Sequence, residues 1–339
     1  MKIALIAPPW IAVPPPGYGG IEWVVALLAD GLVDRGHDVT LFAAGGSVSK
    51  ARIVSPAGPA PGPLAIGDTL LETVHAFGAL EHPERFDLIH DHTSLVALAM
   101  AARGDTPVVH TIHGLITEPY ANWYRSLTDR VHYVSISDSQ RAPAPDLSYA
   151  GRVYNGIHLA DYPFRAEKED FLLFVGRADP AKGAREAVVA AKKAGLPLTL
   201  AVAIKKREER RYWKEQVVPE LTGDETVLAE IPIEQKADLM GRARAVLFPI
   251  TWPEPFGLVM AEANACGTPV IAFPNGAAPE VIADGVSGFI VPDAERMAEA
   301  VTRATEIDPN ACRVRVEEHF SAARMVAGYE EVFDRVLAG

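Results

Sequence analysis

Two cations stand close together near the middle of the chain, in the segment Phe174-Val-Gly-Arg-Ala-Asp-Pro-Ala-Lys-Gly183. Arg177 falls just past an expected strand, and Lys182 falls at the start of the helix expected next. A guanidinium can clamp two oxygen atoms and an ammonium supplies a point charge, so the pair suits a diphosphate group. The alternative is two solvated surface cations without a ligand. The position at a strand end favours the diphosphate.

Two carboxylates, Glu254 and Glu262, lie in the segment that follows a strand expected at residues 245–249. The next helix should begin near Phe256, where its free N–H groups would meet an anion. Glu254 precedes that helix, whereas Glu262 lies inside it among apolar residues. Burying a carboxylate there is costly unless it is hydrogen-bonded, and a sugar or ribose diol is a natural partner. Alternatively, Glu254 serves only the helix dipole and Glu262 faces solvent.

A glycine-rich loop, Pro16-Gly-Tyr-Gly-Gly20, precedes the first expected helix. Gly19 and Gly20 would let the backbone approach a polyphosphate at the start of that helix. The dinucleotide-binding fingerprint is absent because Glu22 stands where its third glycine should be, and no Walker A sequence occurs. An NAD-dependent dehydrogenase is therefore disfavoured. An ordinary tight turn stays open beside a phosphate cradle.

Three histidines follow two neighbouring strands. His90 and His92 would share one face of a strand end, and His113 follows the next strand. A histidine pair suggests a metal, but no third ligand is apparent, so hydrogen-bonded residues of a cleft or core are favoured. Asp-x-Asp does not occur in the chain, so the usual carboxylate handle for a metal-bound nucleotide is absent. We expect no metal.

The elements that must position these residues alternate between short apolar strands and amphipathic helices. Strands are predicted at residues 2–7, 38–43, 86–90, 107–111, 131–137, 152–154, 171–175, 197–204, 227–231, 245–249 and 269–273, and helices at 21–35, from 181, at 208–218 and at 321–337. Residues 44–67 predict a long loop, and residues 155–170 predict a linker. Two such series predict two α/β domains with parallel sheets that face a cleft, with ligands at the carboxyl ends of the strands.

Composition limits the function classes. The 339 residues suggest two domains, and 32 basic against 44 acidic residues give a net charge of −12. So acidic a surface repels phosphate backbones, and no nucleic-acid partner is expected. Two cysteines cannot build a disulfide scaffold, no apolar run is long enough to span a membrane, and the first residues do not resemble a signal peptide. These features predict a soluble, cytoplasmic protein.

The order of the motifs resembles that of the family 4 retaining glycosyltransferases over nearly the whole chain. The resemblance rests on the glycine loop, Gly36-His-Asp-Val39, Phe86-Asp-Leu-Ile-His90, Thr111-Ile-His-Gly114, Asn155-Gly-Ile157, the Arg177 and Lys182 segment, the Glu254 and Glu262 pair, and Ser287-Gly-Phe-Ile-Val-Pro292. It implies the GT-B fold, in which two Rossmann-like domains would span residues 1–160 and 161–320. A closing helix at 321–339 would pack back on the first domain.

The resemblance also implies a role for each motif. The catalytic set would be His113 beside the donor sugar, Arg177 and Lys182 on its diphosphate, and Glu254 on the sugar. The donor-binding set would be Gly19, Gly20, Asn155, Ile231, Phe256, Gly257, Leu258 and Glu262, with Glu262 on the nucleotide ribose. Enzymes of this family take a sugar from a nucleotide-diphosphate sugar, here of the UDP or GDP type, with retention at the anomeric carbon. They need neither a metal nor another cofactor.

The chain departs from the family pattern at two turns. Residues 204–211, Ile-Lys-Lys-Arg-Glu-Glu-Arg-Arg, stand where a Gly-Asp-Gly turn is common, which affects the contacts expected to the nucleotide base. Gly276-Ala277 stands where two glycines are common, which affects the fit around the phosphate. The charged run itself is interpreted as a solvated helix face.

The acceptor is expected to be a soluble glycoside or small molecule. Residues 1–150 carry nine Lys or Arg against fifteen Asp or Glu, so this half lacks the basic face that lipid acceptors usually need. Several aromatic residues could stack on sugar rings or simply pack in the core: Trp10, Tyr18, Tyr120, Trp123 and Tyr124. The Ala-rich, Lys-poor composition suggests actinobacterial antibiotic biosynthesis. Two rival functions stay open, a sugar-nucleotide epimerase or hydrolase of the same fold and a non-catalytic subunit that binds a nucleotide sugar.

Overall fold

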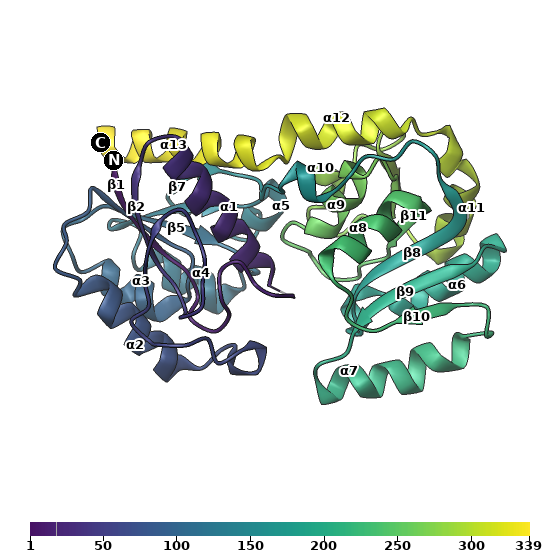
Figure 1. The fold of residues 1–339 in the computed structure, drawn as a ribbon, viewed down its shortest axis with the longest axis horizontal. Coiled ribbons are helices and arrows are strands. Elements are labelled where there is room, and N and C mark those ends of the chain that lie inside the picture. The colour runs from purple at the N-terminus through teal and green to yellow at the C-terminus, as the bar shows by residue number, and fades with distance from the viewer. Residues whose placement is uncertain (18) are drawn as a thin grey trace. The chain divides into compact units, whose positions relative to one another are not determined.

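The computed structural model describes residues 1–17 and 19–339, and the chain divides into two compact units. Unit 1 comprises Met1–Gly156 and Ala322–Gly339, and unit 2 comprises Ile157–Ser321. Each unit contains a parallel sheet with helices, which confirms the α/β class predicted from the alternation of strands and helices (Figure 1). None of the helices in the described part of the chain combines the length and the hydropathy that a membrane crossing requires.

The sheet of unit 1 has the strand order β3-β2-β1-β4-β5-β6-β7, with every strand pair parallel. Its strands are β1 (Lys2–Ile6), β2 (Asp38–Phe42), β3 (Arg52–Val54), β4 (Leu88–Asp91), β5 (Val108–Ile112), β6 (Val131–Ser135) and β7 (Tyr149–Arg152). Its helices are α1 (Gly20–Asp34), α2 (Thr69–Leu80), α3 (Leu95–Ala101), α4 (Glu118–Arg125), α5 (Asp138–Arg141) and α13 (Ala322–Ala338). The successive residues Leu5 and Ile6 are both fully buried, as in a parallel sheet covered on both faces.

The sheet of unit 2 has the strand order β10-β9-β8-β11-β12-β13, again with parallel pairs. Its strands are β8 (Glu169–Arg177), β9 (Leu198–Ala203), β10 (Thr226–Leu228), β11 (Ala243–Phe248), β12 (Val270–Ala272) and β13 (Gly288–Ile290). Its helices are α6 (Ala184–Ala194), α7 (Arg207–Tyr212), α8 (Ile233–Arg242), α9 (Leu258–Ala265), α10 (Ala278–Val281), α11 (Ala294–Arg303) and α12 (Pro309–His319). Strands β8 and β11 are neighbours, so the turns after them share one edge of the sheet.

Helix α13 completes unit 1 although it follows unit 2 in the sequence. Figure 1 shows this yellow helix beside α1 and β7, and both contacts are close. A Cβ on Gly31 of α1 would lie 2.5 Å from a methyl group of Val326, so glycine permits the close approach of the two helices. His37 Nε2 also lies 2.9 Å from Glu330 Oε1.

One prediction about a loop is wrong, and one about a linker holds only in part. Residues 44–67 contain β3, which pairs in parallel with β2 and is too short for its hydrophobic pattern to show in the sequence. Residues 155–170, predicted as a linker, contain the boundary between the two units at Gly156 and Ile157, but Tyr162 in the same stretch is buried in unit 2.

The aromatic residues expected in loops have different environments. Trp10 and Tyr124 are buried, which favours core packing, whereas Tyr120 is exposed and Trp123 packs partly against the core of unit 1. Tyr18 lies outside the described residues.

Candidate active site

The two cations of the 174–183 segment lie where β8 ends. Arg177 is the last residue of that strand. Lys182 ends a 3-10 turn, and α6 starts two residues later, with Gly183 as its N-cap. Gly183 has a φ of 76°, and a Cβ at this position would lie 2.0 Å from the carbonyl oxygen of Pro249. Glycine is therefore required both by the left-handed backbone and by the space, and it fixes the turn that carries Lys182.

Replacing Gly183 by alanine should lower the free energy of unfolding by about 2 kcal/mol or more, because it adds steric overlap to backbone strain. Gly195 at the other end of α6 is the matched control, since its φ is 67° but nothing lies within 4 Å of its Cβ position. Gly195→Ala should cost only about 1 kcal/mol, the cost of the left-handed backbone alone. Urea unfolding of both variants provides the measurement, and equal losses would contradict the steric explanation.

Arg177 is held by a buried carboxylate that the sequence analysis did not identify. Arg177 Nη1 donates to Glu209 Oε1 at 2.8 Å, and the Glu209 side chain is only 3% exposed. Glu209 Oε2 accepts from the backbone N–H groups of Lys205 and Lys206 at 2.7 and 3.1 Å. The interpretation of residues 204–211 as a solvated helix face is therefore wrong at Glu209. The available signal was the position of Glu209 three residues after the helix N-cap, which is typical of a capping box.

Lys182 is paired with Glu254. Lys182 Nζ donates to Glu254 Oε2 at 2.5 Å, and Trp252 Nε1 donates to the same oxygen at 3.0 Å. The ammonium also lies 4.9 Å from the centroid of the Trp252 ring. A Cβ on Gly276 would lie 2.2 Å from the backbone N and O of Glu254. Gly276, the first residue of the two glycines common in the family, is therefore retained at a position where its backbone touches that of Glu254. The turns after β8 and β11 thus bring two of the four predicted catalytic residues into direct contact.

Glu262 lies inside α9 with its side chain 9% exposed, which confirms a buried position and excludes the surface alternative. Its Oε1 accepts from Tyr162 Oη at 2.7 Å and from Lys236 Nζ at 2.8 Å. Burial, together with the nearby Glu262, raises the pKa of Tyr162 well above its usual range, so this phenol remains a donor. Glu262 Oε2 is buried and has no hydrogen-bond partner among the described residues. An oxygen in this state suits a hydroxyl donor from a ligand.

The start of α9 is set by Gly257, its N-cap, which has a φ of 81°. The helix begins at Leu258, slightly later than the predicted start near Phe256. The Phe256 ring is buried and packs edge-on against Phe320, so only the backbone of this residue can face a ligand. Ile231 lies in the loop before α8, beyond the end of β10.

The remaining predicted site residues belong to unit 1. Gly19 is the N-cap of α1 and Gly20 is its first residue. A Cβ on Gly19 would lie 2.8 Å from Glu22 Oε2, and burial raises the pKa of this carboxyl. Asn155 follows β7 and is buried, with no partner for its Oδ1 in the described part of the chain.

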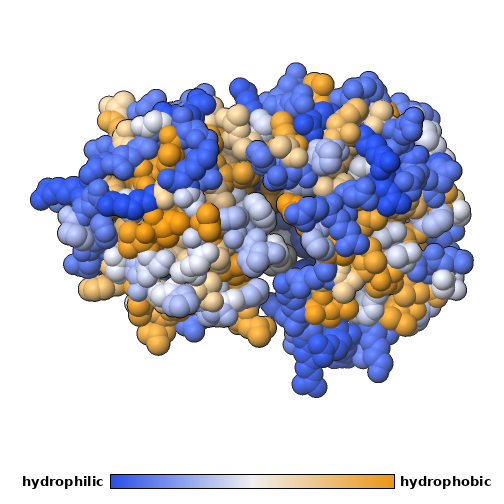
Figure 2. Space-filling view, in the orientation of Figure 1, coloured by the Kyte–Doolittle hydropathy of each residue, from blue (hydrophilic) through white to orange (hydrophobic). Residues whose placement is uncertain are grey.

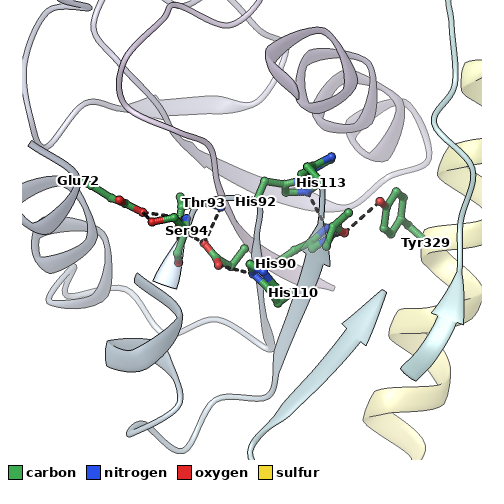
Figure 3. Close-up of polar contacts among 10 residues, drawn as sticks. Glu72, His90, His92, Thr93, Ser94, His110, His113 and Tyr329 are labelled. Atoms are coloured by element: carbon green, nitrogen blue, oxygen red, sulfur yellow. Dashed lines mark hydrogen bonds and ion pairs between the residues drawn. The ribbon is translucent and has the colours of Figure 1, made fainter. Parts of the chain in front are cut away.

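His113 follows β5 and is connected to the two other predicted histidines. His90 and His92 are buried and hydrogen-bonded, as predicted for core residues (Figure 3). Next to them, His110 Nδ1 lies 2.7 Å from Asp91 Oδ2 in a fully buried pair.

Two family models match the chain. The model described as Glycosyltransferase Family 4 matches residues 18–159, and the one described as Glycosyl transferases group 1 matches residues 161–318. Together they cover most of both units.

Known proteins resemble the chain over nearly its full length. The phosphatidyl-myo-inositol mannosyltransferase of Mycolicibacterium smegmatis is 28% identical to it, over 91% of this chain and 86% of that protein. The crystal structure of AviGT4, a glycosyltransferase involved in Avilamycin A biosynthesis, is 27% identical with a TM-score of 0.76, covering 100% of this chain and 98% of that one. Sucrose-phosphate synthase from Thermosynechococcus elongatus is 23% identical to this chain, and the two structures match with a TM-score of 0.81 over 99% of each chain. This likeness concerns the fold alone.

Proposed function

Since the chain belongs to glycosyltransferase family 4 and has the GT-B fold, we propose that it is a retaining, metal-independent transferase that uses a nucleotide-diphosphate sugar of the UDP or GDP type. The acceptor in this proposal is a soluble glycoside or small molecule. The observation that carries the proposal is the group of charges at the carboxyl ends of β8 and β11, where Arg177 pairs with the buried carboxylate of Glu209 and Lys182 pairs with the half-buried carboxylate of Glu254.

Donor binding would use each group of unit 2 differently. Arg177 and Lys182 would bind the diphosphate, and the N–H groups at the start of α9 would add partial positive charge. Glu262 Oε2 would accept a hydrogen bond from a ribose hydroxyl, which would supply the partner that this oxygen lacks among the described residues. Calorimetry with UDP, GDP and the corresponding monophosphates tests this assignment. One diphosphate should bind more tightly than its monophosphate, and equal affinities would contradict the role of the two cations.

The chemical step would break the bond between the anomeric carbon and the diphosphate oxygen. Negative charge then grows on the leaving phosphate, where Arg177 and Lys182 would stabilise it. The acceptor hydroxyl would attack the same face of the sugar, form the new bond to the anomeric carbon and pass its proton to the departing phosphate oxygen. We assign no residue as a covalent nucleophile.

Activity should survive treatment with EDTA, because the two cations would supply the charge that a metal supplies in other transferases. Initial rates are measured before and after removal of divalent ions, with and without added Mg²⁺ or Mn²⁺. A rate that is lost with EDTA and restored by either ion would show that the site has been misread.

The exposed side chains of α2 help to decide between a soluble acceptor and a lipid acceptor. Leu70, Val74 and Phe77 form an exposed apolar stripe at helical spacing, and Leu64 precedes them. Figure 2 shows orange side chains at the lower edge of unit 1, where α2 lies in Figure 1. This stripe, and the lipid in the name of the mannosyltransferase relative, favour a lipid acceptor as the second candidate. However, residues 63–81 contain no Lys or Arg to attract anionic headgroups, which supports the soluble acceptor.

Three experiments separate the remaining possibilities. Sedimentation with vesicles that contain phosphatidylinositol should leave the protein in the supernatant, and co-sedimentation would favour the lipid acceptor. Incubation with the donor alone should release little free sugar and no epimer, because release or epimerisation without an acceptor would indicate a hydrolase or an epimerase. Donor binding without turnover on any glycoside would indicate a non-catalytic subunit.

The likeness to AviGT4 supports antibiotic biosynthesis as the setting and oligosaccharide intermediates as the first acceptors to test.

A further inference from the structure

Five side chains of unit 1 form a continuous series of hydrogen bonds from His113 to α13 (Figure 3). We call this series the histidine relay, and its members are His113, His92, His90, Thr111 and Tyr329. His113 Nε2 lies 2.8 Å from His92 Nδ1, and His92 Nε2 lies 3.4 Å from His90 Nδ1. His90 Nε2 lies 2.9 Å from Thr111 Oγ1, which in turn lies 3.0 Å from Tyr329 Oη. The relay therefore runs from a strand end of the sheet to the last helix of the chain.

The three imidazoles of the relay are neutral at physiological pH. Burial lowers the pKa of His90 and of His92 far below the usual range, and it lowers the pKa of His113 to about 3, with neighbouring imidazoles adding to each shift. The nearby Asp91 carboxylate is hydrogen-bonded to His110 and Thr93 and pairs with none of the three rings. A neutral imidazole carries one N–H, so each ring inside the relay must donate on one side and accept on the other.

The direction of donation is set at the far end of the relay. Tyr329 is fully buried, and Thr111 Oγ1 is the one hydrogen-bond partner of its hydroxyl within the part of the chain that the structure describes. An unpartnered buried O–H costs about 1–3 kcal/mol, so Tyr329 donates to Thr111. Thr111 must then donate its own proton to His90 Nε2.

The positions of the ring protons on His90, His92 and His113 follow from this direction of donation. Because His90 accepts at Nε2, its proton lies on Nδ1 and is donated to His92 Nε2. His92 in turn carries its proton on Nδ1 and donates it to His113 Nε2. The proton of His113 must therefore lie on Nδ1, the ring nitrogen that points out of the relay.

We propose that Thr111, acting through His90 and His92, is a positioning residue that holds His113 in the Nδ1–H tautomer. His113 then offers a hydrogen-bond donor to an oxygen atom of a ligand and cannot act there as a general base. The functional part of this proposal rests on the proposed glycosyl transfer and on the family resemblance, which implies a donor sugar beside His113. The tautomer itself does not depend on that function.

The test uses the full chain labelled with ¹⁵N-histidine, because long-range proton–nitrogen spectra distinguish a protonated ring nitrogen from a bare one. The resonances of His113 are identified by their loss in His113→Gln. At pH 7 the wild type should show a proton on Nδ1 and none on Nε2. Thr111→Val keeps the shape but removes the hydroxyl, so both tautomers of His113 should be populated. Thr111→Ser keeps a hydroxyl donor and should restore the wild-type spectrum.

Kinetics supply the second readout. If the valine variant populates both tautomers about equally, half of the molecules hold the competent form and kcat/KM should fall about twofold, with recovery in the serine variant. A wild-type His113 protonated on Nε2, or an unchanged spectrum in Thr111→Val, would overturn the proposal. If the spectra change as expected while kcat/KM does not, the histidine relay stands and the placement of the donor sugar beside His113 fails.

Discussion

Replacing Arg177 or Lys182 by alanine should lower kcat by about a hundredfold or more. Each cation would stabilise the charge that develops on the leaving diphosphate, and one preorganised donor of this kind is typically worth about 3–4 kcal/mol in the transition state. Arg177 is already held at its position by Glu209 before any ligand binds, so little reorganisation is needed. Initial-rate kinetics at saturating donor measure the effect.

A matched control for these variants is Lys193→Ala. Lys193 lies on α6, away from the turn that carries Lys182, and its side chain is about half exposed and pairs at the surface with Glu295, 3.2 Å away. Its loss should change kcat by less than about twofold, since exposed ion pairs contribute little. Near-wild-type rates in Arg177→Ala or Lys182→Ala would contradict the proposal that the diphosphate binds at the turn after β8.

The second large effect should separate Glu254 from Glu262. Glu254→Gln should lower kcat while leaving the affinity for the free nucleoside diphosphate within about threefold, which is less than ~1 kcal/mol. The proposed contact of Glu254 is with the sugar, whose geometry and charge change during the reaction. The substitution also weakens the ion pair with Lys182, which leaves that ammonium available to phosphate.

Glu262→Gln should show the opposite pattern. Its proposed partner, the ribose, does not change in the transition state, so the variant should raise KM more than it lowers kcat and should bind the nucleoside diphosphate more weakly. Calorimetry with the diphosphate, together with initial rates for both glutamine variants, decides between the roles. If Glu254→Gln loses nucleotide affinity and Glu262→Gln keeps it, the two roles are reversed and the donor lies the other way along α9.

The sequence predicts best where a residue's environment is local. The strands with long apolar patterns and the first helix follow from spacing alone, and the buried position of Glu262 inside α9 was one of two alternatives that the spacing offered. The three-residue strands β3 and β13 were not predicted, because so short a strand shows no period of its own, although strands were predicted where the equally short β10 and β12 lie.

Partnerships between distant parts of the sequence were not predictable. Glu262 meets Tyr162 and Lys236 only through the tertiary fold, and Tyr162 stands in a stretch whose polar and proline-containing sequence suggested a linker. Glu209 is one charge in a run of charges, and although its position three residues after the helix N-cap is typical of a capping residue, its contact with Arg177 depends on the packing of α7 near the end of β8. The roles of the site residues come from the family resemblance and remain predictions.

The place of α13 in the sequence determines the order in which the protein can fold during synthesis. Unit 2 is inserted between the first 156 residues and the final helix, so the ribosome completes unit 2 before unit 1. Until α13 emerges, the nascent sheet of unit 1 lacks the side chains of Tyr329 and Phe333, which pack against His90. The first part to be synthesised is thus the last to be stabilised, and a chain that stops at Ser321 would leave apolar surface of unit 1 uncovered for chaperones and proteases to recognise.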